Sequence, residues 1–275
     1  MKNWSKLLLI LILFSLNNCS KEAKEISLIK ESNQEDEMIT AYKEGIKNLD
    51  DGDAFYAAKK FLEAELLFPQ SDWASKSLLM ASYSYYLQDY YFEAISNLER
   101  FIKTYPKDSR MDYIHYLLGM CYYENIAGEK KDLQQLIIAK SEFNIVIKRY
   151  PSTDFALDAK FKIDLINDIL ASKELYLGRH YVKKEKWIAA IKRFQNIINE
   201  YQTTVYVEEA IHRLVEVHYK IGLESEAKKY ASLLGYNYLS GEWYKETYRI
   251  FNKDYKKRQI KKEKDGLIKK FKRLY

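Results

Sequence analysis

The stretch Glu93-Ala94-Ile95-Ser96-Asn97-Leu98-Glu99-Arg100-Phe101-Ile102-Lys103-Thr104-Tyr105-Pro106 decides the fold. Its apolar residues recur at helical spacing, which predicts an amphipathic helix that ends at the Tyr-Pro pair. Related stretches each carry a small residue, a large apolar residue four positions later and a closing aromatic: Ala57 to Pro69, Ala94 to Pro106, Ala139 to Pro151 and Ala190 to Gln202. The chain is therefore predicted to repeat one helical unit.

The composition favours an all-helical protein. The chain has 275 residues, of which 47% are hydrophobic, so it can bury a sizeable core. It contains only 9 Gly and 3 Pro, and no stretch shows strong period-two alternation bounded by turn residues, so a sheet is not expected. The 25 tyrosines suit packing between the helices of neighbouring repeats.

The spacing of small residues indicates which helices pair. Gly45 lies twelve positions before Ala57, and Gly178 lies twelve before Ala190. Small residues at both places let two helices approach closely, which is typical of tetratricopeptide (TPR) repeats of about 34 residues. We therefore predict an all-α fold, a TPR superhelix of about five helix-turn-helix repeats.

The third and fourth repeats depart from this regular pattern. In the third repeat Gly119 lies twenty positions before Ala139, and the polar segment 124–135 is predicted to be a loop inserted between the two helices. Residues 153–173 are predicted to form one long helix, after which a repeat restarts at Leu175. A final docking helix is expected over 242–255.

The first residues are typical of a lipoprotein leader. Lys2 and Lys6 precede an apolar run, residues 7–16, which is too short to remain as a membrane span. Leu16-Asn17-Asn18-Cys19 resembles a bacterial lipobox, although Asn18 departs from the usual Gly, Ala or Ser. The sequence therefore predicts a signal peptide over 1–18 and lipidation of Cys19. Ser20, where inner-membrane lipoproteins often carry Asp, points to the outer membrane. The alternative is an ordinary signal peptide with a chance cysteine.

The remaining chain divides by composition and charge. We predict a flexible tether over 19–37, N-terminal repeats over 38–151, C-terminal repeats with a capping helix over 152–255, and a basic extension over 256–275. Residues 253–275 carry eleven Lys or Arg against three acidic residues, so the net charge of +6 comes from this end of the chain.

The sequence predicts no catalytic or metal site. Glu208-Glu209-x-x-His212 looks like half of a di-iron motif, but the chain has no second copy, and the histidines are expected on helix surfaces. Cys121 is expected to be a small buried side chain. Phosphate-binding Gly loops, Ser nucleophile elbows and Cys-x-x-Cys pairs are missing from the sequence. We expect a protein that is not an enzyme, with no metal and no cofactor besides the covalent lipid on Cys19.

The order of these features resembles the BamD family, lipoproteins of the BAM complex that assembles outer membrane proteins. The resemblance covers Cys19 to about Tyr238. It is carried by the lipobox cysteine, the inserted loop and a series of repeat motifs: Phe68-Pro69, Phe101 before Tyr105-Pro106, Asp112-Tyr113-x-x-Tyr116-x-x-Gly119, Tyr150-Pro151-Ser152-Thr153, and Tyr181 to Trp187 followed by Ala189 and Arg193. Each motif is generic to repeats, whereas their order with the loop and the anchor is fairly specific.

The resemblance implies that the N-terminal and C-terminal repeats bind different partners. The N-terminal repeats would form a groove for unfolded β-barrel precursors, and an aromatic concave face suits an extended chain with alternating apolar residues. Our candidates for client binding are Tyr42, Tyr83, Tyr86 and Tyr116. The alternative for these tyrosines is that they only pack helices together.

The C-terminal repeats would bind the periplasmic domain of BamA, the barrel subunit of the complex. Arg193 occupies the position of an arginine that the family uses in that contact, and we assign Trp187 to the same partner-binding region. The resemblance further implies a lipid-anchored protein on the periplasmic face of the outer membrane, where other BAM lipoproteins are partners and no nucleic acid is expected.

Two other classes of protein are alternatives. One is another periplasmic TPR adaptor, for example a coordinator of cell division, which would usually lack the lipidated cysteine and begin with a coiled coil. The other is an enzyme with a cryptic site, for which the sequence offers no motif.

Overall fold

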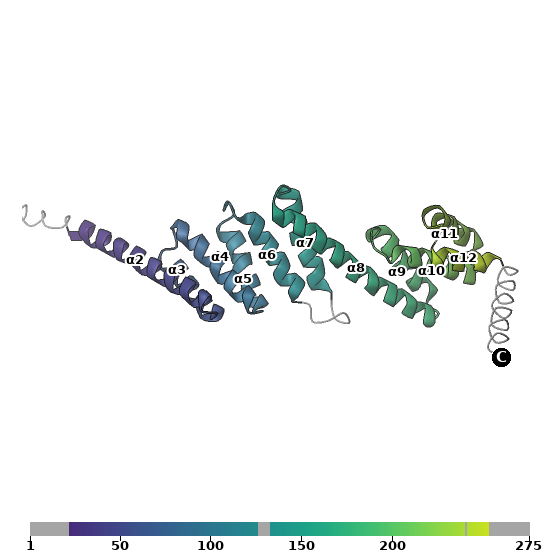
Figure 1. Ribbon diagram of the computed structural model, residues 1–275, viewed down its shortest axis with the longest axis horizontal. Helices are drawn as coiled ribbons and strands as arrows, with labels where there is room; N and C mark the ends of the chain where they lie inside the picture. The colour runs from purple at the N-terminus through teal and green to yellow at the C-terminus, as the bar shows by residue number, and fades with distance from the viewer. Residues whose placement is uncertain (1–21, 126–132, 240, 253–275) are drawn as a thin grey trace, which may run out of the picture. The chain divides into compact units, whose positions relative to one another are not determined.

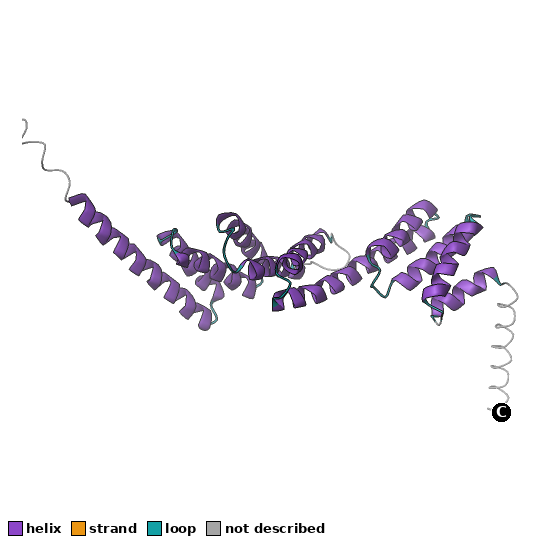
Figure 2. Ribbon diagram, turned by 90° about the horizontal axis from the view of Figure 1, so that it is seen from above, coloured by secondary structure: helices purple, strands orange, loops and turns teal. Residues whose placement is uncertain are grey.

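Helices form the whole secondary structure of the described part of the chain, which in this computed structural model is residues 22–125, 133–239 and 241–252, with side chains described from residue 33. Figures 1 and 2 show these helices in two views, and no strand occurs among the described residues. The helices are α2 (Glu22–Asp50), α3 (Ala54–Leu67), α4 (Asp72–Leu87), α5 (Tyr91–Thr104), α6 (Met111–Glu124), α7 (Gln134–Arg149), α8 (Asp154–Lys183), α9 (Trp187–Glu200), α10 (Val207–Lys220), α11 (Glu224–Asn237) and α12 (Glu242–Phe251).

Consecutive helices pack against each other in pairs. Helices α2 to α7 contact their neighbours in chain order, and so do α9, α10 and α11, while α12 packs on α10 and α11. The all-α fold of helix-turn-helix repeats is therefore confirmed.

Glycines make the close approach of paired helices possible. A Cβ atom added to Gly45 on α2, or to Gly119 on α6, would lie 2.7 Å from ring carbons of Phe61 or Phe143. Gly178 on α8 is closer still to the ring of Phe194. In each case the glycine lies on the first helix of a repeat and the phenylalanine on the second. Because glycine has no side chain, the phenylalanine ring can pack directly against the backbone of the first helix. This explains why the pattern also holds in the third repeat, where the loop lengthens the spacing.

The aromatic residue that closes each repeat begins the same turn. The N–H three positions later donates to the carbonyl of Phe68, Tyr105, Tyr150 or Tyr201, over 3.1 to 3.2 Å. Proline follows the first three of these aromatics, at the position of a turn where its fixed φ is favourable. After Tyr201 the residue at the proline position is Gln202, and the same turn still forms. Proline therefore favours this turn but is not required for it.

The tether prediction needs a correction. Helix α2 begins at Glu22, so residues 22–37 are helical and continue into the first helix of repeat one. The segment contains neither Gly nor Pro and is rich in Glu, which favours a helix. Its polar composition predicted flexibility, yet no residue in it stops the helix. Residues 19–21 lie outside the described part.

The fourth repeat also differs from its prediction. Helix α8 runs unbroken from Asp154 to Lys183, so no restart occurs at Leu175. One helix therefore serves both as the predicted long helix and as the first helix of the following repeat, which it forms with α9. The capping helix α12 ends at Phe251, and the predicted extension to 255 falls on residues 253–255, outside the described part.

The chain forms two compact units. Of the described residues, the N-terminal unit contains α2 to α7 and the start of α8 up to Leu157, and the C-terminal unit contains the part from Asp158 onward. The predicted division at 151/152 lies a few residues before this boundary. Among the helices that the structure describes, none combines the length and the apolar character needed to cross a bilayer.

The turn between α5 and α6 contains a carboxylate, Asp108, whose contribution to stability should depend on pH. Asp108 accepts hydrogen bonds from the Arg110 side chain at 2.6 and 2.8 Å and from the Arg110 backbone at 2.9 Å. These bonds, with one involving Ser75, outweigh burial and lower the pKa of Asp108 to about 2. An unfolded Asp has a pKa near 3.9, so the contribution of Asp108 is complete above about pH 5 and is lost as the pH falls through 2.

We therefore expect Asp108→Asn to lower the free energy of unfolding at pH 7 by about 1 to 2 kcal/mol, an amount reduced by solvent around Arg110. Urea unfolding at pH 7, 5, 3 and 2 measures it. The variant should lose less stability than the wild type between pH 5 and 2. Asp164→Asn, a change at an exposed position of α8, is the control. Equal acid sensitivity of Asp108→Asn and the wild type would contradict the assignment.

Candidate interaction surfaces

The predicted client-binding tyrosines are all half-buried, and each has aromatic neighbours. Tyr42 on α2 packs edge-on against Phe61 and Trp73, with ring centroids 5.2 and 5.0 Å apart. Trp73 is 37% exposed and carries the ammonium group of Lys76 over its ring at 4.7 Å. The pair Tyr42–Trp73 therefore joins the core to the surface, and sequence reasoning did not include Trp73.

Tyr83 and Tyr86, both on α4, belong together. They pack against the hydrophobic core that contains Leu78, Leu98 and Leu118. Tyr113 on α6 packs against the same core as Tyr83 and Tyr86, and its burial raises the pKa of its phenol. Tyr113 is thus a third member of this group that our candidate set missed, although it lies three positions before Tyr116.

Tyr116 is joined to that group through Phe155, whose ring centroid lies 5.1 Å from that of Tyr113. The Tyr116 ring contacts Phe143 and Phe155, with centroids 5.9 and 5.2 Å away. All four candidate tyrosines therefore have a packing role, which accounts for part of each side chain. Client binding remains a prediction for the exposed parts.

Arg193 on α9 faces α8 in the C-terminal unit. Its Nη1 donates to Glu174 Oε1 at 2.9 Å, and its side chain is 39% exposed against 14% for Glu174. Both residues line a hollow of about 380 Å³, together with Tyr181, Lys192, Asn196 and Asn199. The predicted partner-binding arginine is thus at the surface and held by one ion pair beside a polar hollow.

Trp187 is not among the residues that line this hollow. It is the first residue of α9, packs partly buried against the core that contains Leu175 and Phe194, and has the ammonium group of Lys220 at 4.6 Å from its ring centroid. The structure therefore does not bring Trp187 and Arg193 into one site, and a packing role accounts for much of the tryptophan side chain.

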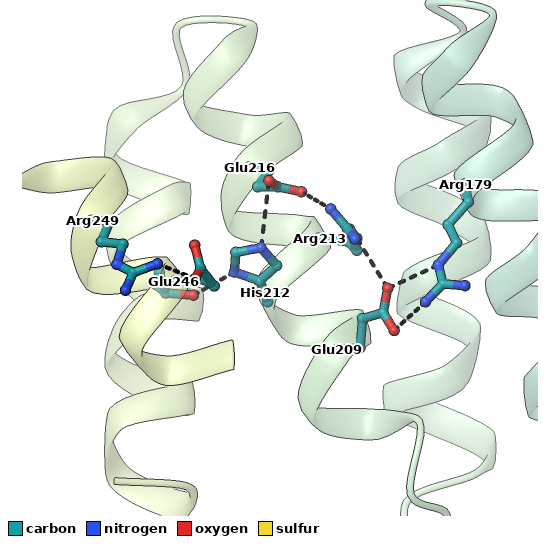
Figure 3. A network of polar contacts seen from close by, with 8 residues as sticks. Arg179, Glu209, His212, Arg213, Glu216, Glu246 and Arg249 are labelled. Carbon is teal, nitrogen blue, oxygen red and sulfur yellow. Dashed lines mark hydrogen bonds and ion pairs between the residues drawn. The ribbon is translucent and has the colours of Figure 1, made fainter. Parts of the chain in front are cut away.

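A chain of polar contacts joins α8, α10 and α12, as Figure 3 shows. Arg179 pairs with Glu209, which also accepts from Arg213 at 3.1 Å. Arg213 donates to Glu216 at 2.6 Å, and Glu216 lies 3.4 Å from His212 Nε2. Burial opposes ionisation of Glu216, but hydrogen bonds from His212 and Arg213 outweigh it and lower the pKa of this carboxyl group to about 2.

At the His212 end, this series of polar contacts holds the capping helix α12 in place. His212 Nδ1 lies 2.7 Å from Thr247 Oγ1, and the His212 ring lies against Trp243 on α12, with centroids 5.0 Å apart. Both His212 and Thr247 are buried. These contacts give the network a structural role, which is to hold α12 on α10.

The expectation that the histidines lie on helix surfaces is wrong for three of them. His115, His212 and His218 are buried, and their Nδ1 atoms lie 2.7 Å from Glu142, Thr247 and the Leu214 carbonyl. Each is therefore a hydrogen-bonded core residue that spacing alone could not reveal. No cluster of His, Cys, Asp or Glu suited to a metal ion occurs in the described ranges. Burial raises the pKa of the Cys121 thiol to about 12, as for an inert core cysteine.

Three predictions fall on residues outside the described part: the signal peptide 1–18, the lipidated Cys19 and the basic extension 256–275. Of the predicted inserted loop, residues 126–132 also lie outside it. These predictions stay predictions.

Comparison with known proteins identifies a matching family and several similar proteins. A protein-family model described as YfiO, outer membrane lipoprotein, matches residues 34–233. Outer membrane protein assembly factor BamD of Caulobacter vibrioides is 39% identical over 243 residues, which is 88% of this chain and 79% of that protein. BamD of Rickettsia prowazekii is 40% identical over 213 residues, 78% of this chain and 85% of that protein. Among solved structures, the TPR domain of P58(IPK) is 14% identical, with a TM-score of 0.48 over 86% of this chain and 62% of that one.

Proposed function

Since the chain belongs to the YfiO family of outer membrane lipoproteins, we propose that it is a lipid-anchored scaffold that assembles β-barrel proteins into the outer membrane as part of the BAM complex. The observation that carries this proposal is the similarity to the assembly factor BamD over 88% of the chain. Repeats of paired helices suit such a role, because they present extended surfaces to other chains.

The two units would divide the work. The N-terminal unit binds unfolded barrel precursors at the exposed edges of its tyrosines, where Tyr42 with Trp73, and Tyr83 with Tyr86, offer rings to apolar side chains of an extended client. The C-terminal unit binds the periplasmic domain of BamA through Arg193, whose exposed guanidinium group beside a polar hollow supports this assignment. Other BAM lipoproteins would be further partners.

Attachment to the membrane would come from acyl chains on Cys19. The described helices include no membrane span, and each buried CH₂ group of an acyl chain contributes about 0.8 kcal/mol to anchoring. The protein acts from the periplasmic face of the outer membrane and works by binding alone, without catalysis and without a cofactor.

Depletion of the protein in its own organism tests this proposal. With its gene under repressible control, outer membrane β-barrel proteins should fall several-fold together in the outer membrane fraction, as measured by quantitative mass spectrometry. Unrelated outer membrane lipoproteins are the control and should stay near their starting amounts. Unchanged barrel proteins after depletion would contradict the proposed function.

A further inference from the structure

One of the arginine–glutamate pairs that join different helices in the described part is built differently from the others. Two of these pairs are closed, which means that both carboxylate oxygens accept hydrogen bonds from one guanidinium group. In Arg100–Glu65 the two bonds measure 2.5 and 2.8 Å, and Arg179–Glu209 also forms two bonds. The third is open, because Arg193 donates to Glu174 through Nη1 alone. Two-bond geometry is the favourable way to pair these groups, so the open pair calls for an explanation.

The second oxygen of Glu174 is the unusual atom of this pair. Glu174 Oε2 is buried and has no hydrogen-bond partner. A carboxylate can accept about four hydrogen bonds, and a buried charged acceptor that lacks a donor is costly. This oxygen is buried while Arg193 pairs with Glu174, so a donor from another protein can reach it only if the Arg193 side chain turns away.

The surroundings offer room for such a group. Glu174 and Arg193 line the same hollow of about 380 Å³, where Lys192, Asn196 and Asn199 add polar side chains from α9. Arg193 uses one of its five N–H groups on Glu174 and is 39% exposed, so its other N–H groups can donate to a carboxylate of another protein. Once Arg193 turned to that carboxylate, Glu174 would lose its compensating charge.

We propose that Glu174 is a second contact residue for the BamA periplasmic domain, and that it accepts hydrogen bonds from a lysine or arginine of that domain. The inference rests on the proposed function and adds the chemistry of the partner surface, which must present a basic side chain next to the acidic one that binds Arg193. Four charges then alternate across the interface, and each buried charge has an opposite neighbour. A partner with only the acidic side chain would leave Glu174 uncompensated, so Glu174 determines specificity.

The test is a titration of the full chain, purified in mild detergent, with the periplasmic domain of BamA from the same organism. Glu174→Gln keeps the shape and the acceptor for Arg193 but removes the charge, and we expect it to weaken binding about 10- to 100-fold. The loss should persist in an Arg193→Ala background, because Glu174 has its own contact. Glu65→Gln, the same change in a closed pair, is the matched control and should leave affinity unchanged.

Thermal unfolding of each variant checks that it is folded. As a second measurement, each Lys and Arg of the partner domain is replaced with Ala against the wild-type chain. One of these changes should match the loss from Glu174→Gln and show little further loss when combined with it.

Three results would overturn the inference while the wild type still binds. These are unchanged or tighter binding by Glu174→Gln, a loss that vanishes in the Arg193→Ala background, and a partner scan in which no basic residue matters. If the wild-type chain itself does not bind the domain, the assignment of Arg193 to BamA fails and this inference fails with it.

Discussion

Replacing Phe194 with alanine should lower the free energy of unfolding of the C-terminal unit by about 3 to 5 kcal/mol. The ring is fully buried on α9, lies against the bare backbone of Gly178 on α8, and belongs to the core with Leu175 and Leu214. The facing position on α8 is Gly178, which has no side chain that could fill part of the cavity. Urea denaturation followed by far-UV circular dichroism measures the loss.

Phe92→Ala is the matched control for this prediction. The same residue type is 79% exposed on α5, so its removal should change stability by less than about 1 kcal/mol. Equal effects of the two substitutions would contradict the role of the glycine–phenylalanine contact in holding the repeats together.

Reversing the charge of Arg193 should weaken binding of the BamA periplasmic domain by about 2 kcal/mol or more, roughly a 30-fold loss of affinity. A glutamate at this position would repel the partner's acidic side chain and would also lie beside Glu174, so two carboxylates would share the hollow. Titration calorimetry with the full chain measures the effect, and the loss should be smaller at high salt.

Arg149→Glu provides the comparison, since it makes the same charge change at an exposed position of α7. It should bind the domain as the wild type does. If Arg193→Glu binds with unchanged affinity, the assignment of Arg193 to this contact is wrong.

The architecture was largely predictable because a few positions define it. The spacing from Gly45 to Ala57 and Phe61 identified both helices of a repeat, and the contact between Gly45 and Phe61 follows from that pattern. Membership of the BamD family, predicted from the order of the motifs, is confirmed by the comparisons. Local patterns succeed here because each repeat buries its core mostly against adjacent repeats.

Other features depend on contacts that the sequence pattern does not encode. Helix α8 passes through the predicted restart at Leu175 because no residue there breaks a helix. The burial of His212 depends on α12 folding back so that Thr247 and Trp243 cover it. The pairing of Arg193 with Glu174 joins side chains nineteen positions apart across a turn, and only the packing of α8 on α9 brings them together.

The most direct measurement of the central claim is capture of the native complex. The full chain, tagged at a site that leaves its leader intact, is purified from detergent-solubilised outer membranes of its own organism. The account predicts that BamA co-purifies in a stoichiometric amount with the wild type and is lost with Arg193→Glu, while Arg149→Glu retains it. Recovery of the chain without BamA, or equal recovery of BamA with both charge reversals, would contradict it.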